Sequence, residues 1–192
     1  MHAILAVLAF VLGSIYAPDP SYPWNVVSGG TVIAELQVAE GKVKEVAVLS
    51  GAEPFTDSAT SALSQWRLPP DVQGTQLAVV CFRHPYLYNL SAGEPEIRPA
   101  RAPSQLPYPV SVIQPLYPPN AVAEGGVVLR AEISPDGIVS NVEAISEKGA
   151  LTGTSIDALR HWRFVPAQNE QGKRIGSQAY VVFVFRLLLS AP

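Results

Sequence analysis

The ionisable side chains of this chain do not form a pattern typical of a catalytic centre. Its three histidines, His2, His84 and His161, lie far apart in the sequence, and His161 directly precedes a tryptophan. The carboxylates fall mostly on turns and on polar strand faces, where solvated charge is their ordinary role. We therefore expect no enzyme activity, no metal site and no cofactor, and we look for binding chemistry instead.

Composition narrows the class of protein further. The 192 residues are 48% hydrophobic and 15% charged, which is typical of one packed domain or two small ones. A net charge of -3 without any basic run argues against nucleic acid as a partner. The single cysteine, Cys81, lies in an apolar run, so it excludes an intramolecular disulfide and a zinc cluster and is expected to be a small core residue.

An apolar segment opens the chain. Residues 3–17 are almost entirely apolar, and Pro18-Asp19-Pro20 ends any helix there. The segment is shorter than the roughly 20 residues that cross a bilayer comfortably. It is interpreted as a signal peptide cleaved after Gly13, Ser14 or Ala17, as an uncleaved membrane anchor, or as a buried soluble helix. The first two alternatives place the rest of the chain outside the cytoplasm.

The chain contains an internal repeat. Tyr22-Pro23 recurs as Tyr117-Pro118, 95 residues later, and the tryptophan at 66 recurs at 162, 96 residues later. One extra residue in the second turn explains the change of offset, because turns tolerate insertions. The repeat predicts two small domains, 21–90 and 113–192.

Each copy has the pattern of a hairpin followed by a short helix. Alternating apolar residues predict strands at 31–38 and 42–49 in the first copy and at 127–133 and 138–145 in the second. The residues that follow have one apolar face at helical spacing and end at the tryptophan. Four residues are expected to be structural anchors at helix ends and turns: Trp66, Trp162, Gly137 and Pro166.

The last strand pattern differs from the others. Residues 179–189 are apolar on both faces, and Arg186 is the only charge among them. If helices cover one face of the sheet, the other face must pack on the other repeat, on a second protomer or on a partner. Residues 77–82 are the counterpart in the first copy, where Pro85 cuts the strand short. Residues 91–112, between the copies, contain five prolines and predict an extended, semi-rigid linker.

These signals together resemble a known family. The order of Gln114-Pro115-Leu116-Tyr117-Pro118, Asp136-Gly137 and Trp162-Arg163-Phe164-Val165-Pro166 resembles the C-terminal domain of TonB, the energy transducer of Gram-negative outer-membrane uptake. The resemblance covers residues 113–188, and residues 22–83 look like a degenerate copy without the Gln-Pro pair. It implies an α+β fold of two such domains, each a three-stranded antiparallel sheet with one or two helices on one face.

The resemblance also implies a binding mode. A domain of this family binds the N-terminal segment of an outer-membrane receptor, which adds as a strand beside the last strand of the domain. Gln114 would contact the segment through its side chain, and Pro115, Tyr117 and Pro118 would shape its approach. The backbone between Gln178 and Arg186 would be the docking edge, with these residues along it: Gln178, Ala179, Tyr180, Val182, Val184 and Arg186.

Two functions stay open at this point. The first is a periplasmic transducer or adaptor that binds receptor N-terminal segments and supports transmembrane transport, with inner-membrane motor subunits as further partners. The second is a periplasmic scaffold whose two domains pack on each other or form a homodimer through their last strands, without coupling to the proton-motive force. The short N-terminal segment, the duplicated domain and the uncovered apolar face favour the second function. No small-molecule substrate is expected in either case.

Overall fold

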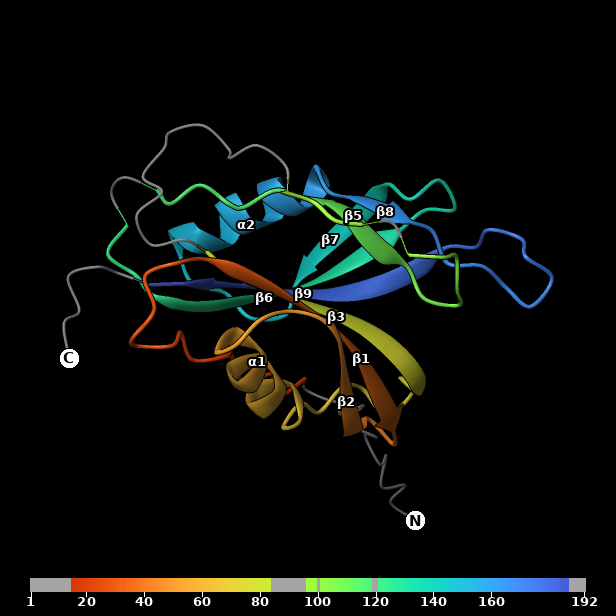
Figure 1. Cartoon of the computed structure of the whole chain (residues 1–192), viewed down its shortest axis with the longest axis horizontal. Helices are drawn as coiled ribbons and strands as arrows, with labels where there is room; N and C mark the ends of the chain where they lie inside the picture. The colour runs from red at the N-terminus through yellow and green to blue at the C-terminus, as the bar shows by residue number, and fades with distance from the viewer. Residues whose placement is uncertain (1–14, 84–95, 100, 119–120, 187–192) are drawn as a thin grey trace, which may run out of the picture.

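The strands of this protein form one six-stranded sheet with a helix on each side, together with a smaller three-stranded sheet (Figure 1). The computed structural model describes residues 15–83, 96–99, 101–118 and 121–186. The strand order of the large sheet is β2-β1-β3-β9-β6-β7. This mixed architecture agrees with the predicted α+β class.

The first half of the large sheet is built by residues 30–82, within the segment predicted as the first copy of the repeat. β1 (Gly30–Ala39) pairs antiparallel with β2 (Lys42–Ser50) and with β3 (Gly74–Phe82), and α1 (Phe55–Leu63) packs on one face. The predicted hairpin and helix are therefore confirmed. The ladder between β1 and β2 shifts register twice, which shortens the regular edge that β2 presents to solvent.

The second half repeats this arrangement. β6 (Gly125–Ile133) pairs antiparallel with β7 (Val139–Ala144) and with β9 (Ser177–Phe185), and α2 (Ala150–Arg160) packs on one face. The hairpin and the helix predicted for this copy are confirmed as well. The short strand β8 (Arg163–Val165) follows α2 and belongs to the small sheet.

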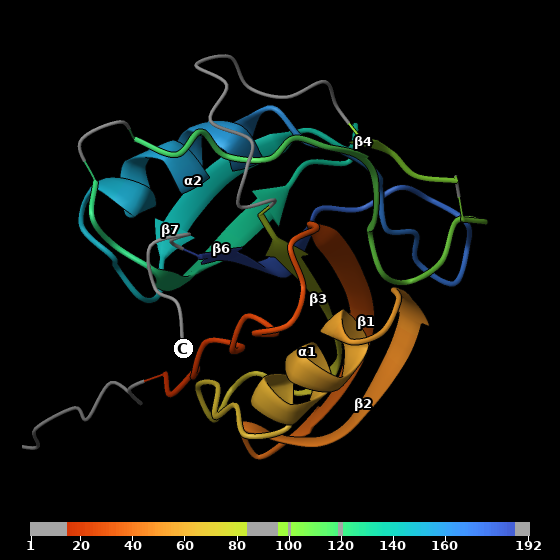
Figure 2. The same cartoon turned by 60° about the vertical axis from the view of Figure 1, so that its left-hand side comes forward.

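The two halves join through their last strands. β3 pairs with β9 in parallel, from Leu77 opposite Ala179 to Phe82 opposite Val184. The predicted arrangement of two separate domains is thus not confirmed, because one hydrogen-bonded sheet runs through both copies. β3 and β9 occupy equivalent places in the two halves and run in the same direction side by side. One half is therefore turned over relative to the other, and α1 and α2 lie on opposite sides of the sheet (Figures 1 and 2).

Side-chain alternation divides the core into two clusters, one on each face. Along β9, residues 179, 181, 183 and 185 face α2, whereas residues 180, 182 and 184 face α1. Because α2 covers only its own half, the remaining part of each face needs another cover. This explains why β9 is apolar on both faces. α2 covers one face, and residues from the first half of the chain cover the other.

The proline-rich segment between the copies supplies part of that cover, which differs from the extended linker predicted for residues 91–112. β4 (Glu96–Ile97) and β5 (Tyr108–Val112) form the small sheet with β8. The side chains of Tyr108 and Val112 are buried in the cluster on the α2 face. The predicted spacer thus folds onto the first copy, because the apolar face of β1 and β3 there has no helix above it.

The N-terminal segment has the same role on the other face. Ile15, Ala17, Tyr22 and Val26 pack against the cluster on the α1 face. In Figure 2 this segment, coloured red, runs past α1 toward the start of β1. No helix within the described ranges is long and apolar enough to cross a membrane. The interpretations of residues 3–17 as a signal peptide or an anchor fall mostly on residues 1–14, outside the described residues.

Several contacts occur twice, at the spacing of the repeat. The Trp66 indole N–H donates to the Pro18 carbonyl at 3.1 Å, and the Trp162 indole N–H donates to the Ile113 carbonyl at 2.9 Å. The Leu68 N–H donates to the Gly41 carbonyl at 2.6 Å, and the Phe164 N–H donates to the Gly137 carbonyl at 2.9 Å. Equivalent residues therefore make equivalent contacts in the two halves.

Candidate partner-binding surfaces

The Gln-Pro-x-Tyr-Pro segment lies between β5 and β6, at the end of the sheet where β3 finishes. The Arg83 guanidinium donates from Nε to the Pro115 carbonyl at 2.9 Å, and the Tyr117 hydroxyl donates to the Ala123 carbonyl at 2.7 Å. Pro115 is buried, while Gln114, Tyr117 and Pro118 are half-buried. The segment is thus fixed by contacts of its backbone and its tyrosine, and one of those contacts comes from the first copy.

The arginines that follow β3 and β9 connect the two copies reciprocally. Arg83, after β3, lies 5.5 Å from the ring centroid of Tyr117 in the second copy. Arg186, after β9, lies 5.7 Å from the ring centroid of Tyr22 in the first copy. Arg186 also donates to the carbonyls of Pro23 and Val26, at 3.3 and 2.9 Å. Each arginine therefore holds the Tyr-Pro segment of the opposite copy.

The expected docking strand β9 has no open edge in this structure. One edge pairs with β3 and the other pairs with β6 along the whole strand. Of the residues expected there, Gln178 and Arg186 are half-buried, and Ala179, Tyr180, Val182 and Val184 are buried. The position that a partner strand was expected to occupy is taken by β3, which sequence patterns did not predict because the pairing joins residues about 100 positions apart.

The four expected anchors lie in the two cores. Trp66 and Trp162 are 1% and 0% exposed, and Pro166 is buried. Gly137 has φ of 78°, and a Cβ at this position would lie 2.0 Å from the Phe164 carbonyl oxygen. Only glycine allows the β6–β7 turn to approach the backbone after α2 this closely.

Burial is the main cause of the pKa shifts among the described titratable groups. Burial raises the pKa of Cys81 to about 12, so its thiol stays protonated and unreactive at neutral pH. Burial likewise raises the pKa of Tyr22 to about 12, partly offset by Arg186. His161, the C-cap residue of α2, is exposed, and its Nδ1 lies 2.7 Å from the Asp157 carbonyl oxygen. Within the described ranges, no group of histidine, cysteine and acidic residues could hold a metal ion.

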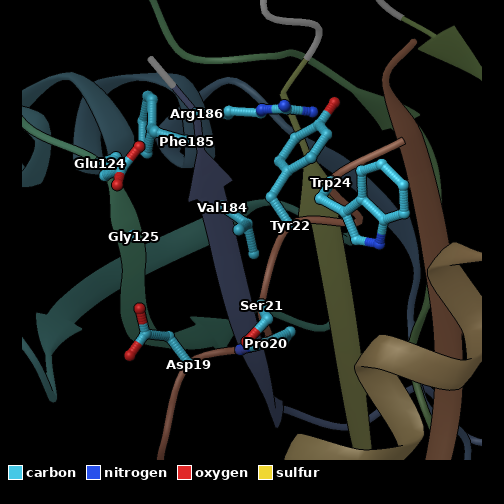
Figure 3. Close-up of a pocket in the computed structure, with 10 residues that line it drawn as sticks. All are labelled: Asp19, Pro20, Ser21, Tyr22, Trp24, Glu124, Gly125, Val184, Phe185 and Arg186. Atoms are coloured by element: carbon cyan, nitrogen blue, oxygen red, sulfur yellow. The ribbon is translucent and has the colours of Figure 1, made fainter. Parts of the chain in front are cut away.

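One surface was not found from the sequence. Asp19, Tyr22 and Trp24 line a pocket of about 500 Å³ with Glu124 and with the end of β9 (Figure 3). Trp24 is 74% exposed, in contrast to the two core tryptophans. A signal was present: Trp24 falls at the repeat position where the second copy has Pro119, so the repeat gives it no structural role.

Comparison with known families bears on the second half of the chain. Residues 113–187 match the family described as Gram-negative bacterial TonB protein C-terminal. The match begins just before the Gln-Pro-x-Tyr-Pro segment and ends just after β9, so it contains β6, β7, α2, β8 and β9. Residues before 113 lie outside the match. No curated protein matches the chain.

Proposed function

We propose that this protein is a non-enzymatic, TonB-like adaptor of the Gram-negative envelope that binds N-terminal segments of outer-membrane receptors and supports transport across that membrane. The family match over residues 113–187 carries the proposal. We further propose that the protein lies in the periplasm, exported by a signal peptide or anchored by residues 3–17, with inner-membrane motor subunits as candidate further partners. The first copy, 21–90, is a degenerate duplicate of 113–192, a proposal supported by the contacts that recur at the repeat spacing.

The closed sheet sets a condition on this function. A segment that adds beside residues 178–186 has to take the place of β3, since the other edge of β9 pairs with β6 inside the TonB-like half. Gln114 is well placed for such an exchange. It precedes Pro115, whose carbonyl is bound by Arg83 directly after β3, so a segment that replaces β3 would end close to Gln114.

Titration of the full chain with receptor N-terminal peptides tests the proposal. The amides of residues 178–186 are expected to shift, and the amides of 77–82 to lose protection from hydrogen exchange as β3 leaves. Gln114→Ala should weaken binding about 2- to 12-fold, the equivalent of one neutral hydrogen bond. Gln171→Ala, in an exposed turn, is the matched control. Unchanged amides along β9, together with equal affinities of the two variants, would remove the receptor-binding proposal.

The pairing of β3 with β9 favours a second candidate, an envelope scaffold that is not coupled to the proton-motive force. In this case the sheet stays closed and partners bind elsewhere, or a second copy binds as a homodimer. Cross-linking in intact envelopes separates the two candidates. Receptors and motor subunits as the main products support the adaptor, whereas products with a second copy or with other envelope proteins support the scaffold.

A further inference from the structure

Trp24 is a large apolar side chain held in an exposed position by its neighbours. Its relative exposure is 74%, whereas the other two tryptophans are 0–1% exposed. The loop around it is fixed, because Arg186 donates to the carbonyls on both sides, at Pro23 and Val26. An exposed aromatic ring on an anchored loop is typical of a contact residue rather than of incomplete packing.

Two pockets meet at this indole. One is the pocket of about 500 Å³ that Trp24 shares with Asp19, Glu124 and the end of β9. The other is about 460 Å³ and lies between Trp24 and α1, where Asp57, Ser61 and Gln65 line it. Asp19, Ser21 and Tyr22 border both pockets. The surface formed by these two adjoining pockets is here called the Trp24 groove.

Acidic residues predominate along the Trp24 groove. Asp19, Asp57 and Glu124 line it, and Arg186 is the single basic residue in its lining. The guanidinium of Arg186 lies over the Tyr22 ring and binds the carbonyls of Pro23 and Val26, so its hydrogen bonds are used within the chain. Lys148 lies 3.9 Å from Asp19 and offsets part of that charge. Asp57, exposed in the first turn of α1, has no ion pair with another described residue.

We propose that the Trp24 groove binds a lysine- or arginine-bearing segment of a partner polypeptide. Figure 3 shows the carboxylates of Asp19 and Glu124 on one side of the pocket and the rings of Tyr22 and Trp24 on the other. A cationic side chain between them pairs with a carboxylate while its charge lies over the indole face, the arrangement that cation–π attraction favours. This site lies apart from Gln114 and shares only the end of β9, at Val184 and Arg186, with the expected docking edge. It uses carboxylates and aromatic rings rather than strand addition, so it does not rest on the receptor-binding proposal.

The test uses the full chain and a capped hexalysine peptide, with a capped hexaserine peptide as the neutral reference. The indole N–H resonance of Trp24, assigned by its loss in Trp24→Phe, should shift saturably with hexalysine and stay in place with hexaserine. Trp24→Leu should weaken binding about two- to fivefold, the size of an exposed cation–π contact. Asp57→Asn should weaken it by a similar factor, and salt should weaken it further.

Asp136→Asn is the matched control, because it removes one carboxylate from an exposed turn of the β6–β7 hairpin, outside the groove lining. It should leave hexalysine affinity close to that of the unmodified chain. Equal losses in Asp57→Asn and Asp136→Asn would show attraction by net charge alone and would overturn the proposal. A Trp24 resonance that does not shift with hexalysine would overturn the proposal too. A shift at lower concentration with a neutral N-acetylglucosamine oligomer would overturn it in favour of a glycan site. Gln114→Ala should have no effect.

Discussion

Replacing Arg83 with methionine should weaken the whole fold, although this residue lies at the end of a strand. Arg83 is 4% exposed, and its Nε donates to the buried Pro115 carbonyl at 2.9 Å. A hydrogen bond from a charged group contributes about 1.5–3 kcal/mol, and a desolvated cation–π contact with Tyr117 adds about 0.5–2 kcal/mol. Methionine keeps most of the apolar stem, so we expect a loss of about 2–4 kcal/mol in the free energy of unfolding.

Urea unfolding followed by tryptophan fluorescence and by far-ultraviolet circular dichroism measures this loss. Arg83→Met should lower the midpoint at an unchanged slope, which indicates a change of stability rather than of the unfolded state. In Arg186→Met the free energy of unfolding should fall by less, about 1–2 kcal/mol, because Arg186 is half-buried and solvent can replace its contacts. Arg160→Met is the control: its ion pair with Asp157 is mostly exposed, so its loss should stay below about 0.5 kcal/mol.

The same experiment tests whether the two halves unfold together. Because β3 and β9 pair within one sheet, both spectroscopic signals should follow a single transition in every variant. A loss in Arg83→Met no larger than in Arg160→Met would refute the role given to Arg83. Two separate transitions in the unmodified chain would refute the view that the copies share one cooperative core.

Three further predictions concern single positions. Gly137→Ala should lower the free energy of unfolding by about 1–3 kcal/mol, because φ is 78° and the new Cβ would meet the Phe164 carbonyl. Gly74→Ala, with φ of 75° but open space around it, should lower it by less. Thermal unfolding compares the two variants, and equal losses of stability would contradict the role of the close approach. Cys81 should resist iodoacetamide at pH 8 in the folded protein and react after unfolding. Burial raises its pKa from 9.0 to about 12, so between these pH values the folded state binds more protons than the unfolded state, and this thiol should lower the free energy of unfolding as pH rises from 9 towards 12. If the N-terminal segment is cleaved, mass spectrometry should place the cut before residue 16, since Tyr16 exchanges two backbone hydrogen bonds with Arg67, at 2.9 and 2.8 Å; a mature chain that starts at Pro18 would contradict this.

Local patterns were sufficient to predict the elements of each copy. The alternation in 31–38 and 127–133 reflects strands with one face in a core, and the structure places β1 and β6 there. Residues 32, 34, 36 and 38 lie in the cluster on the α1 face, and residues 127, 129, 131 and 133 lie in the cluster on the α2 face. The helices were predicted because their apolar faces have helical spacing. These signals depend only on residues a few positions apart, so no knowledge of tertiary pairing was needed.

The pairing between the copies could not be predicted in this way. The apolar residues on both faces of β9 showed that a cover was required, but they did not distinguish the other repeat from a second protomer or a partner. Proline density in 91–112 indicated extended backbone, which is equally compatible with a free spacer and with a strand such as β5, where the pairing with β8 shifts register after Pro109. Register between distant strands depends on the whole sheet, and single-sequence periodicity carries no information about it.

The Trp24 groove was missed for a related reason. Sequence reasoning gave Trp66 and Trp162, which the repeat relates to each other, a role as core anchors, and both are buried. It gave no role to Trp24. Trp24 has no tryptophan counterpart, so its environment depends on how the N-terminal segment crosses β9. That crossing follows from the parallel pairing of β3 with β9, which the sequence patterns left open.

The burial of β3 determines what kind of segment could ever open the sheet. Residues 77–82 are each 0–1% exposed, and removing such side chains from the core costs about 1.5–3 kcal/mol apiece, on the order of 10 kcal/mol for the strand. A polar segment could restore the backbone hydrogen bonds, but it would not compensate for the free energy lost when the apolar side chains of β3 leave the core. A partner that adds beside β9 must therefore be apolar on both faces, as β3 is, or must bind while β3 stays in place. Among receptor peptides, affinity at the β9 edge should accordingly rise with apolar residues on both faces, and equal binding by a polar sequence of the same length would show that the segment docks elsewhere.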